Sequence, residues 1–101
     1  MVTAIIKIKV APKAKYGYRS IAHMIAEFKE VESVYLMSGD YDLSVIVNCG
    51  DLKEIGSFVA ERLSTIDGVL STASSFILER YKEQGKLLGT EESDERGLFT
   101  I

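Results

Sequence analysis

The sequence has one cysteine, one proline, one histidine and no tryptophan among its 101 residues. A single cysteine excludes a disulfide within the chain and is typical of a reducing compartment, so we expect a cytoplasmic protein. No apolar run approaches the roughly 20 residues that span a bilayer. The first residues also lack the basic segment and long apolar core of a signal peptide. We therefore expect no membrane partner.

The sequence also lacks an excess of positively charged side chains. The net charge is −3, and residues 1–82 hold ten basic and ten acidic side chains, whereas residues 83–101 hold two basic and five acidic ones. A neutral body lacks the positive surface that binding to a nucleic-acid backbone needs, so we expect no direct nucleic-acid partner. We predict one folded domain over residues 1–82 and an acidic, mobile C-terminal tail over residues 83–101.

The apolar residues that are present follow two periodicities. Alternating or continuous apolar runs predict strands at 2–10, 31–37, 43–48 and 69–79, and helical spacing predicts helices at about 16–29 and 51–67. This βαββαβ order is the ferredoxin-like α+β arrangement, a four-stranded antiparallel sheet with two helices on one face. In the segment 43–48, apolar side chains occur at both the odd and the even positions, so both faces of this strand carry apolar residues. We therefore expect the second sheet face to be covered by another subunit.

The stretch between the second and third predicted strands, residues 38–44, is the most informative part of the sequence. Gly39 permits the positive φ that a tight connection requires. One interpretation is a hairpin turn whose acidic side chains, Asp40 and Asp42, point into water. The other is a ligand site, in which backbone N–H groups bind a carboxylate and an aspartate binds an ammonium group. Composition alone leaves both interpretations open.

Residues suited to catalysis are few. His23 falls on the polar side of the first predicted helix, and no triad or metal-ligand spacing surrounds it or Cys49. The pair Asp40 and Asp42 lacks further grouped metal ligands. We therefore expect no catalytic residue, no metal and no cofactor. The alternative is a small dimeric α+β-barrel enzyme of the monooxygenase-like type, in which His23 and Cys49 would be the residues to test.

Two motifs resemble a known family. The stretch Val34-Tyr35-x3-Gly39-Asp40-Tyr41-Asp42-Leu43 resembles the V-x4-G-x-Y/F-D signature of the effector-binding domain of Lrp/AsnC transcription regulators. The stretch Gly68-Val69-x2-Thr72-x-Ser74-x2-Ile77-Leu78 resembles that domain's G-V-x2-T-x-T-x2-V-L segment, with Ser74 in place of the second threonine. The resemblance covers about residues 2–82, and we expect the family's N-terminal helix-turn-helix domain to be absent.

The resemblance implies a stand-alone RAM domain (regulation of amino acid metabolism) that is not an enzyme. It implies a dimeric α+β barrel whose dimers associate further, often into an octamer, and an amino acid or related small effector bound between dimers. Transcription would then be modulated through partners, including full-length relatives in mixed oligomers. In the implied site Asp42 binds the effector's ammonium group. The implied effector-binding residues are Ser38, Gly39, Asp40, Tyr41 and Asp42, with Thr72 and Ser74 contributed across the interface.

Overall fold

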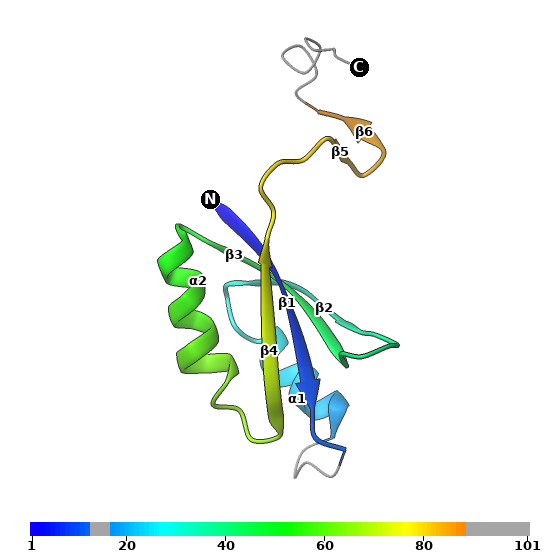
Figure 1. The fold of residues 1–101 in the computed structure, drawn as a ribbon, viewed down its shortest axis with the longest axis vertical. Coiled ribbons are helices and arrows are strands. Elements are labelled where there is room, and N and C mark those ends of the chain that lie inside the picture. Colours follow the sequence, from blue (N-terminus) through cyan, green and yellow to red (C-terminus); the bar gives the residue numbers. More distant parts are fainter. Residues whose placement is uncertain (13–16, 89–101) are drawn as a thin grey trace.

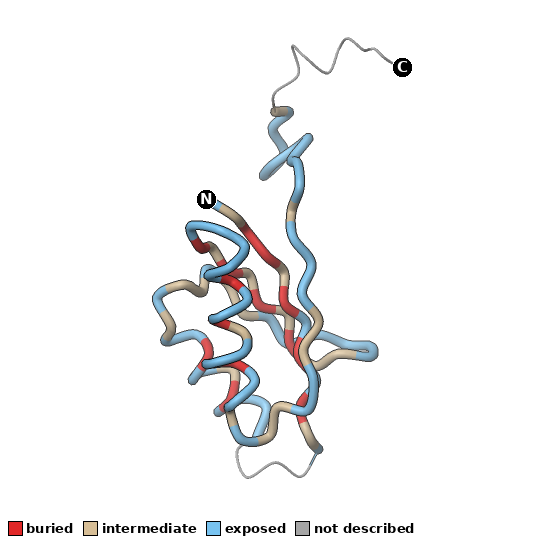
Figure 2. The backbone as a smooth tube through the Cα atoms, turned by 60° about the vertical axis from the view of Figure 1, so that its left-hand side comes forward, coloured by how far each residue is buried: buried red, intermediate tan, exposed pale blue. Residues whose placement is uncertain are grey.

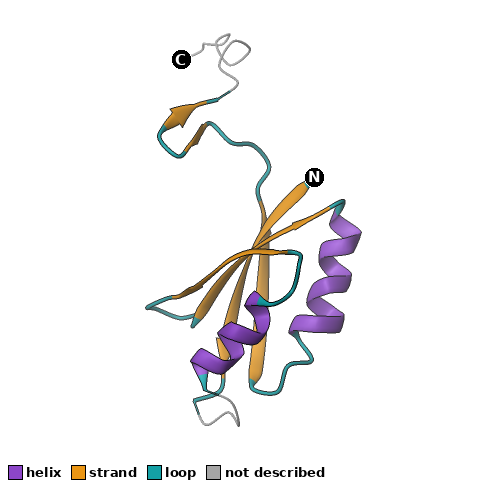
Figure 3. Cartoon of the chain, turned by 180° about the vertical axis from the view of Figure 1, so that it is seen from behind, coloured by secondary structure: helices purple, strands orange, loops and turns teal. Residues whose placement is uncertain are grey.

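The structure is a computed structural model that describes residues 1–12 and 17–88. Four antiparallel strands form a sheet in the order β2-β3-β1-β4, and both helices lie on one face of it (Figures 1 and 3). The strands of the sheet are β1 (Val2–Val10), β2 (Val31–Leu36), β3 (Leu43–Cys49) and β4 (Val69–Phe76), and the helices are α1 (Tyr18–Ala26) and α2 (Leu52–Phe58). The predicted ferredoxin-like α+β fold is confirmed.

The core lies between the sheet and the helices, where Figure 2 shows most of the buried residues. Strand β1 pairs with β3 on one side and β4 on the other, and it presents alternate side chains to the helices. The fully or nearly fully buried apolar side chains of the described residues are Ala4, Ile6, Ile8, Val10, Ile21, Ile25, Leu43, Val45, Val47, Cys49, Ile55, Phe58 and Leu63. The two-residue period of β1 and β3 thus places one apolar row of each strand in the core.

Helix α2 begins at a capping box. The Asp51 carboxylate accepts the Glu54 N–H at 2.8 Å, as the spacing of the two acids predicts. The Glu54 carboxylate reaches back to the residue before the cap and accepts the Gly50 N–H at 2.7 Å. The helix then widens into the π-helix η1 (Val59–Leu63). The sequence predicts Leu52 in the buried stripe, but this side chain is 56% exposed and Phe58 is buried in its place.

The sheet face opposite the helices is mixed in character. In-register partners on this face include Ile5 and Ile46, which are half-buried, whereas Lys7 is exposed. The sequence predicts an apolar association surface here, and the structure shows lysines and serines interspersed among its apolar residues. A relay of polar groups crosses one end of this face. Thr3 donates to Asn48 at 2.6 Å and accepts from Arg80 at 2.8 Å, and Asn48 donates to Glu32 at 2.7 Å.

The chain beyond β4 departs from the prediction. Strand β4 ends at Phe76, three residues before the predicted end, because the following segment leaves the sheet. The short strands β5 (Lys82–Glu83) and β6 (Lys86–Leu87) then pair as a hairpin, so the domain boundary predicted at residue 82 falls inside this hairpin. Residues 89–101 of the predicted tail lie outside the described residues. Among the helices of the described chain, none is long and apolar enough to cross a membrane.

Candidate functional site

The predicted site centres on the loop between β2 and β3. The Met37 N–H donates to the Asp42 carbonyl at 2.8 Å and closes a four-residue connection, residues 38–41. Gly39 has φ +108°, a conformation that side chains rarely adopt, so the expected glycine-dependent turn is confirmed. No N–H group of residues 38–41 donates a hydrogen bond to any residue that the structure describes. These four donors therefore remain available to a ligand or to water.

Asp42 has a structural role that the sequence pattern does not show. One carboxylate oxygen, Oδ2, accepts the Val10 N–H at 2.7 Å, and the Asp42 N–H donates to the Ile8 carbonyl at 2.9 Å. Strand β3 begins after Asp42, so the last N–H group of β1 has no carbonyl of β3 opposite it. The Asp42 carboxylate accepts this N–H group instead. The second oxygen, Oδ1, has no hydrogen-bond partner among the residues described and keeps the capacity to bind a cation.

A cavity of about 270 Å³ lies beside the loop. Its lining residues are Lys7, Met37, Ser38, Asp40, Tyr41, Leu43 and Ser44. Three of the predicted effector-binding residues, Ser38, Asp40 and Tyr41, are therefore brought together, whereas Gly39 and Asp42 do not line the cavity. Lys7 adds a cation that the motif comparison misses, because the loop folds over the outer face of the sheet where Lys7 lies. Lys9 supports the loop by donating to the Asp40 carbonyl at 2.8 Å.

Thr72 and Ser74 lie elsewhere in the same chain. They pair in register with Ile8 and Ile6, so their side chains share the helix-covered face of the sheet, whereas the cavity opens beside Lys7 on the other face. Strand β4 is an edge strand, and Ser74 is exposed while Thr72 is half-buried. A single copy of the chain thus does not unite these two hydroxyls with the loop.

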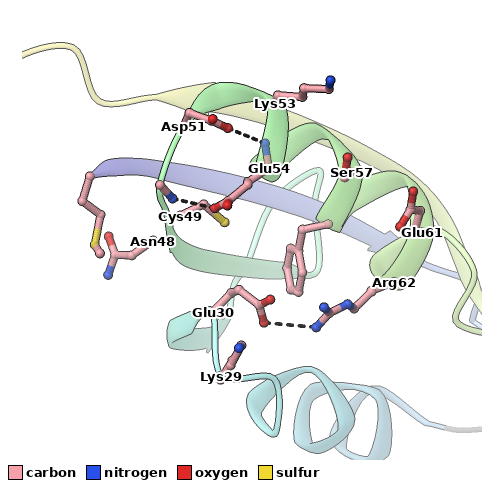
Figure 4. Close-up of a pocket in the computed structure, with 13 residues that line it drawn as sticks. Lys29, Glu30, Asn48, Cys49, Asp51, Lys53, Glu54, Ser57, Glu61 and Arg62 are labelled. Atoms are coloured by element: carbon pink, nitrogen blue, oxygen red, sulfur yellow. Dashed lines mark hydrogen bonds and ion pairs between the residues drawn. The ribbon is translucent and has the colours of Figure 1, made fainter.

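A larger groove of about 630 Å³ lies at the opposite end of β3 (Figure 4). Arg62 forms one wall, where its guanidinium binds Glu30 at 3.2 Å and lies 5.6 Å from the ring centres of both Phe28 and Phe58. These two rings meet edge to face, with centroids 5.4 Å apart. The groove wall is therefore an ordered cation–aromatic cluster that fastens the end of α1 to η1.

Cys49 borders this groove but is buried. Burial, and then the nearby Glu54, Glu30 and Asp51, raises the pKa of its thiol, while Arg62 lowers it to a smaller extent. A raised pKa keeps the thiol protonated and unreactive at neutral pH. His23 is exposed on α1 and does not line the groove, so the two side chains considered for an enzyme are not brought together there. Within the described ranges, no three His, Cys, Asp or Glu side chains are grouped to hold a metal ion.

The fold and the loop together define a ferredoxin-like domain with a candidate effector cavity at its β2–β3 connection. The family model of the Lrp/AsnC ligand binding domain matches residues 3–87. The chain therefore belongs to the Lrp/AsnC family, as the two motifs predict. Two curated relatives, YugG and LrpA, are transcriptional regulators. Neither is described as an enzyme of the monooxygenase-like type.

Two curated relatives illustrate the similarity. The chain is 48% identical over 95 residues to the HTH-type transcriptional regulator YugG of Bacillus subtilis, an alignment that covers 94% of this chain and 57% of YugG. It is 31% identical over 90 residues to the HTH-type transcriptional regulator LrpA of Pyrococcus abyssi, with 74% and 63% covered. The chain thus spans a little over half the length of these relatives.

Solved structures give the same result. A transcriptional regulator from Neisseria meningitidis, crystallised as a complex with L-Met, superposes with a TM-score of 0.75 at 25% identity, covering 90% of this chain and 58% of that one. A protein from Thermus thermophilus superposes with a TM-score of 0.74 at 26% identity, covering 82% of this chain and 100% of that one. The second match extends over the whole of that chain.

Proposed function

We propose that this domain is a cytoplasmic, non-enzymatic module that binds an amino acid or a related small effector and couples binding to self-association. The observation that carries the proposal is the β2–β3 loop, where Ser38, Asp40 and Tyr41, whose backbone N–H groups bond to no described residue, border a cavity that Lys7 also lines. Donors of this kind bind a carboxylate by charge-assisted hydrogen bonds. The complex of the Neisseria relative with L-Met supports an amino acid as the effector class.

In the proposed complex the two charged ends of the effector bind to different groups. The N–H groups of residues 38–41 and the Lys7 ammonium hold the carboxylate, and the free Oδ1 of Asp42 accepts from the effector's ammonium group. A cavity of about 270 Å³ beside the loop fits a small molecule rather than a peptide. Thr72 and Ser74 then come from a neighbouring copy, since β4 is an edge strand of its own sheet.

Self-association is proposed for the outer sheet face. This face has no covering helix in the described chain (Figure 3). Its half-buried Ile5 and Ile46 pair in register on adjacent strands. A second copy that packs its own sheet against this face would bury both rows of side chains and form the dimeric α+β barrel. Further association of dimers, up to an octamer, would bring β4 of one dimer to the loop of another. Regulation of transcription would follow through DNA-binding relatives in mixed oligomers.

The proposal is tested by calorimetric titration of refolded, ligand-free protein with each of the twenty amino acids. We expect at least one to bind, and we expect Asp42→Asn to reduce its affinity at least tenfold. Asp51→Asn is the matched control, because it removes the same charge from a helix cap at which asparagine is equally favourable. Absence of binding for all twenty would contradict the sensing function, and equal losses in both variants would contradict the role of Asp42.

A further inference from the structure

Lys7 lies where the cavity and the proposed association face meet. Its in-register partners are Ser44 on β3 and Ala73 on β4, so the three side chains share the sheet face opposite the helices. The preceding residue of β1 on that face is Ile5, one of the apolar residues of the proposed self-association. Lys7 also lines the cavity of about 270 Å³ beside the β2–β3 loop. One side chain thus belongs to both surfaces.

The ammonium group of Lys7 has no ionic partner in the described chain. It forms neither an ion pair nor a hydrogen bond with any residue that the structure describes, whereas Lys9 on the same face donates to the Asp40 carbonyl at 2.8 Å. Asp40 is the other charged residue that lines the cavity, and its exposed carboxylate forms no ion pair with Lys7. Lys7 is itself exposed, so water alone compensates its charge while the sheet face is open.

A second copy that covers this face removes that water. Four strands about 4.8 Å apart, with β1 and β3 paired over the seven residues from Val2 to Ile8, form a face of only about 20 by 24 Å. A stable interface buries about 800 Å² on each partner, so it needs the whole face. Strand β1 is flanked by β3 and β4, and the Lys7 ammonium group therefore lies inside the interface. Moving an unpaired charge out of water is strongly unfavourable.

We propose that Lys7 makes self-association depend on the effector. In the ligand-free protein a second copy packs against an uncompensated ammonium group, and the dimer is weak. The effector's carboxylate neutralises this group from the cavity side, so the bound form associates more strongly. Because coupling between two binding equilibria is reciprocal, dimer formation strengthens effector binding by the same factor. The inference rests on the proposed function and assigns the coupling between its two parts to one residue.

The first experiment removes the charge in the absence of any ligand. Sedimentation equilibrium of refolded, ligand-free protein gives the dimer dissociation constant, and we expect Lys7→Met to lower it by a factor of about ten or more. Lys53→Met is the matched control, because it removes the same charge from an exposed position of α2, on the other side of the sheet (Figure 3). Lys7→Arg keeps the charge. We expect both of these variants to associate as the wild type does.

The sign of the change decides between two readings of Lys7. A Lys7→Met dimer that is as weak as the wild-type dimer, or weaker, would overturn the inference, because it would show that Asp40 or a carboxylate of the second copy already compensates the charge. If the wild-type dimer does not dissociate on dilution, the midpoint of urea denaturation measures the same difference, since dissociation and unfolding are then one transition. Circular dichroism checks that each variant keeps the wild-type fold.

The second experiment tests the dependence on the effector. The dimer dissociation constants of the wild type and of Lys7→Met are measured in the presence of each of the twenty amino acids. We expect an amino acid that binds the wild type to lower its constant by a factor of about ten or more and to leave the constant of Lys7→Met unchanged. Equal tightening of both dimers would overturn the assigned role of Lys7.

The two proposals fail in different ways. If Lys7→Met associates more tightly without ligand and the wild type binds none of the twenty amino acids, the charge effect of Lys7 is supported and effector sensing is overturned. An amino acid that binds the wild type without changing its dimer dissociation constant would overturn this inference and leave effector binding intact. Wild-type and Lys7→Met proteins that both stay monomeric at all concentrations would overturn the self-association and the coupling together.

Discussion

Asp42 and Val10 are joined by a side chain to backbone hydrogen bond of 2.7 Å that ends the β1 ladder. Asp42 therefore has a structural role in addition to its proposed role in ligand binding. Different substitutions at this position can separate the two roles. Asn at position 42 keeps an oxygen acceptor for the Val10 N–H and removes only the charge. Ala removes both, and it leaves a donor without a partner at a residue that is 3% exposed.

We predict that Asp42→Ala lowers the free energy of unfolding by about 1–3 kcal/mol, the cost of a buried unsatisfied donor. Asp42→Asn is expected to stay within about 1 kcal/mol of the wild type while losing effector binding. Urea denaturation of both variants provides the comparison. Equal stability of the Ala and Asn variants would show that the Val10 bond contributes nothing measurable.

A pair of glycines provides the second prediction. Gly39→Ala places a side chain at φ +108°, and strain of this kind costs about 1–3 kcal/mol. Gly56→Ala is the control, since Gly56 lies in α2 with open space around an added Cβ. There the exchange is expected to stabilise the protein by about 0.5–1 kcal/mol, because alanine has the higher helix propensity. Thermal unfolding of both variants checks the opposite signs, and a shift of the same sign in both would contradict the assigned loop conformation.

The third prediction concerns pH. Burial and nearby carboxylates raise the pKa of Cys49, so the folded state keeps the thiol proton at a pH where the unfolded chain has lost it. This contribution to stability is complete below the pKa of an ordinary thiol, about 8.5, and it is lost as the pH rises toward the folded-state value. Between about pH 7.5 and 10, wild-type protein is expected to lose more stability than Cys49→Ala protein. Parallel pH profiles for the two proteins would contradict a raised pKa.

The fourth prediction tests the polar relay on the outer face. Thr3 is 7% exposed and joins Arg80 to Asn48 through its hydroxyl group. Thr3→Val keeps the shape and removes the hydroxyl. Asn48 is half-buried and Arg80 is exposed, so water replaces part of the lost bonding, and we expect the free energy of unfolding to fall by about 0.5–1.5 kcal/mol. Thr3→Ser retains the hydroxyl and serves as the control. If urea denaturation shows Thr3→Val to be as stable as Thr3→Ser, the relay does not contribute to folding.

The order of elements and the capping box could be predicted from the sequence because both depend on local spacing. The β2–β3 hairpin was also predictable, since Gly39 marks its turn. The placement of Lys7 in the cavity and of Thr72 on the opposite face was not, because each depends on which way the loop bends and on the strand register. The β5–β6 hairpin escaped prediction because its strands are two residues long and its turn begins with Gln84 rather than the more typical asparagine or aspartate.

The buried stripe of α2 shows a different limit. A constant helical period places Leu52 in the core, yet the capping box fixes where the helix starts, and the π-helix then changes its phase. Phe58 and Leu63 are both buried although they are five positions apart. In an α-helix this spacing turns them about 140° away from each other. Only the wider turn, closed by the bond from the Ser64 N–H to the Val59 carbonyl at 2.8 Å, aligns them.

The wider turn also determines how this part of the chain responds to a change in length. In an ordinary α-helix, side chains four positions apart lie on the same face, about 40° from each other around the axis. Removing one residue between Phe58 and Leu63 would give them this spacing, so the phenyl ring and the leucine would both still face the core. The extra residue is therefore an insertion that the wider turn absorbs without changing which side chains are buried, and a relative that lacks it can bury the same pair from ordinary α-helix.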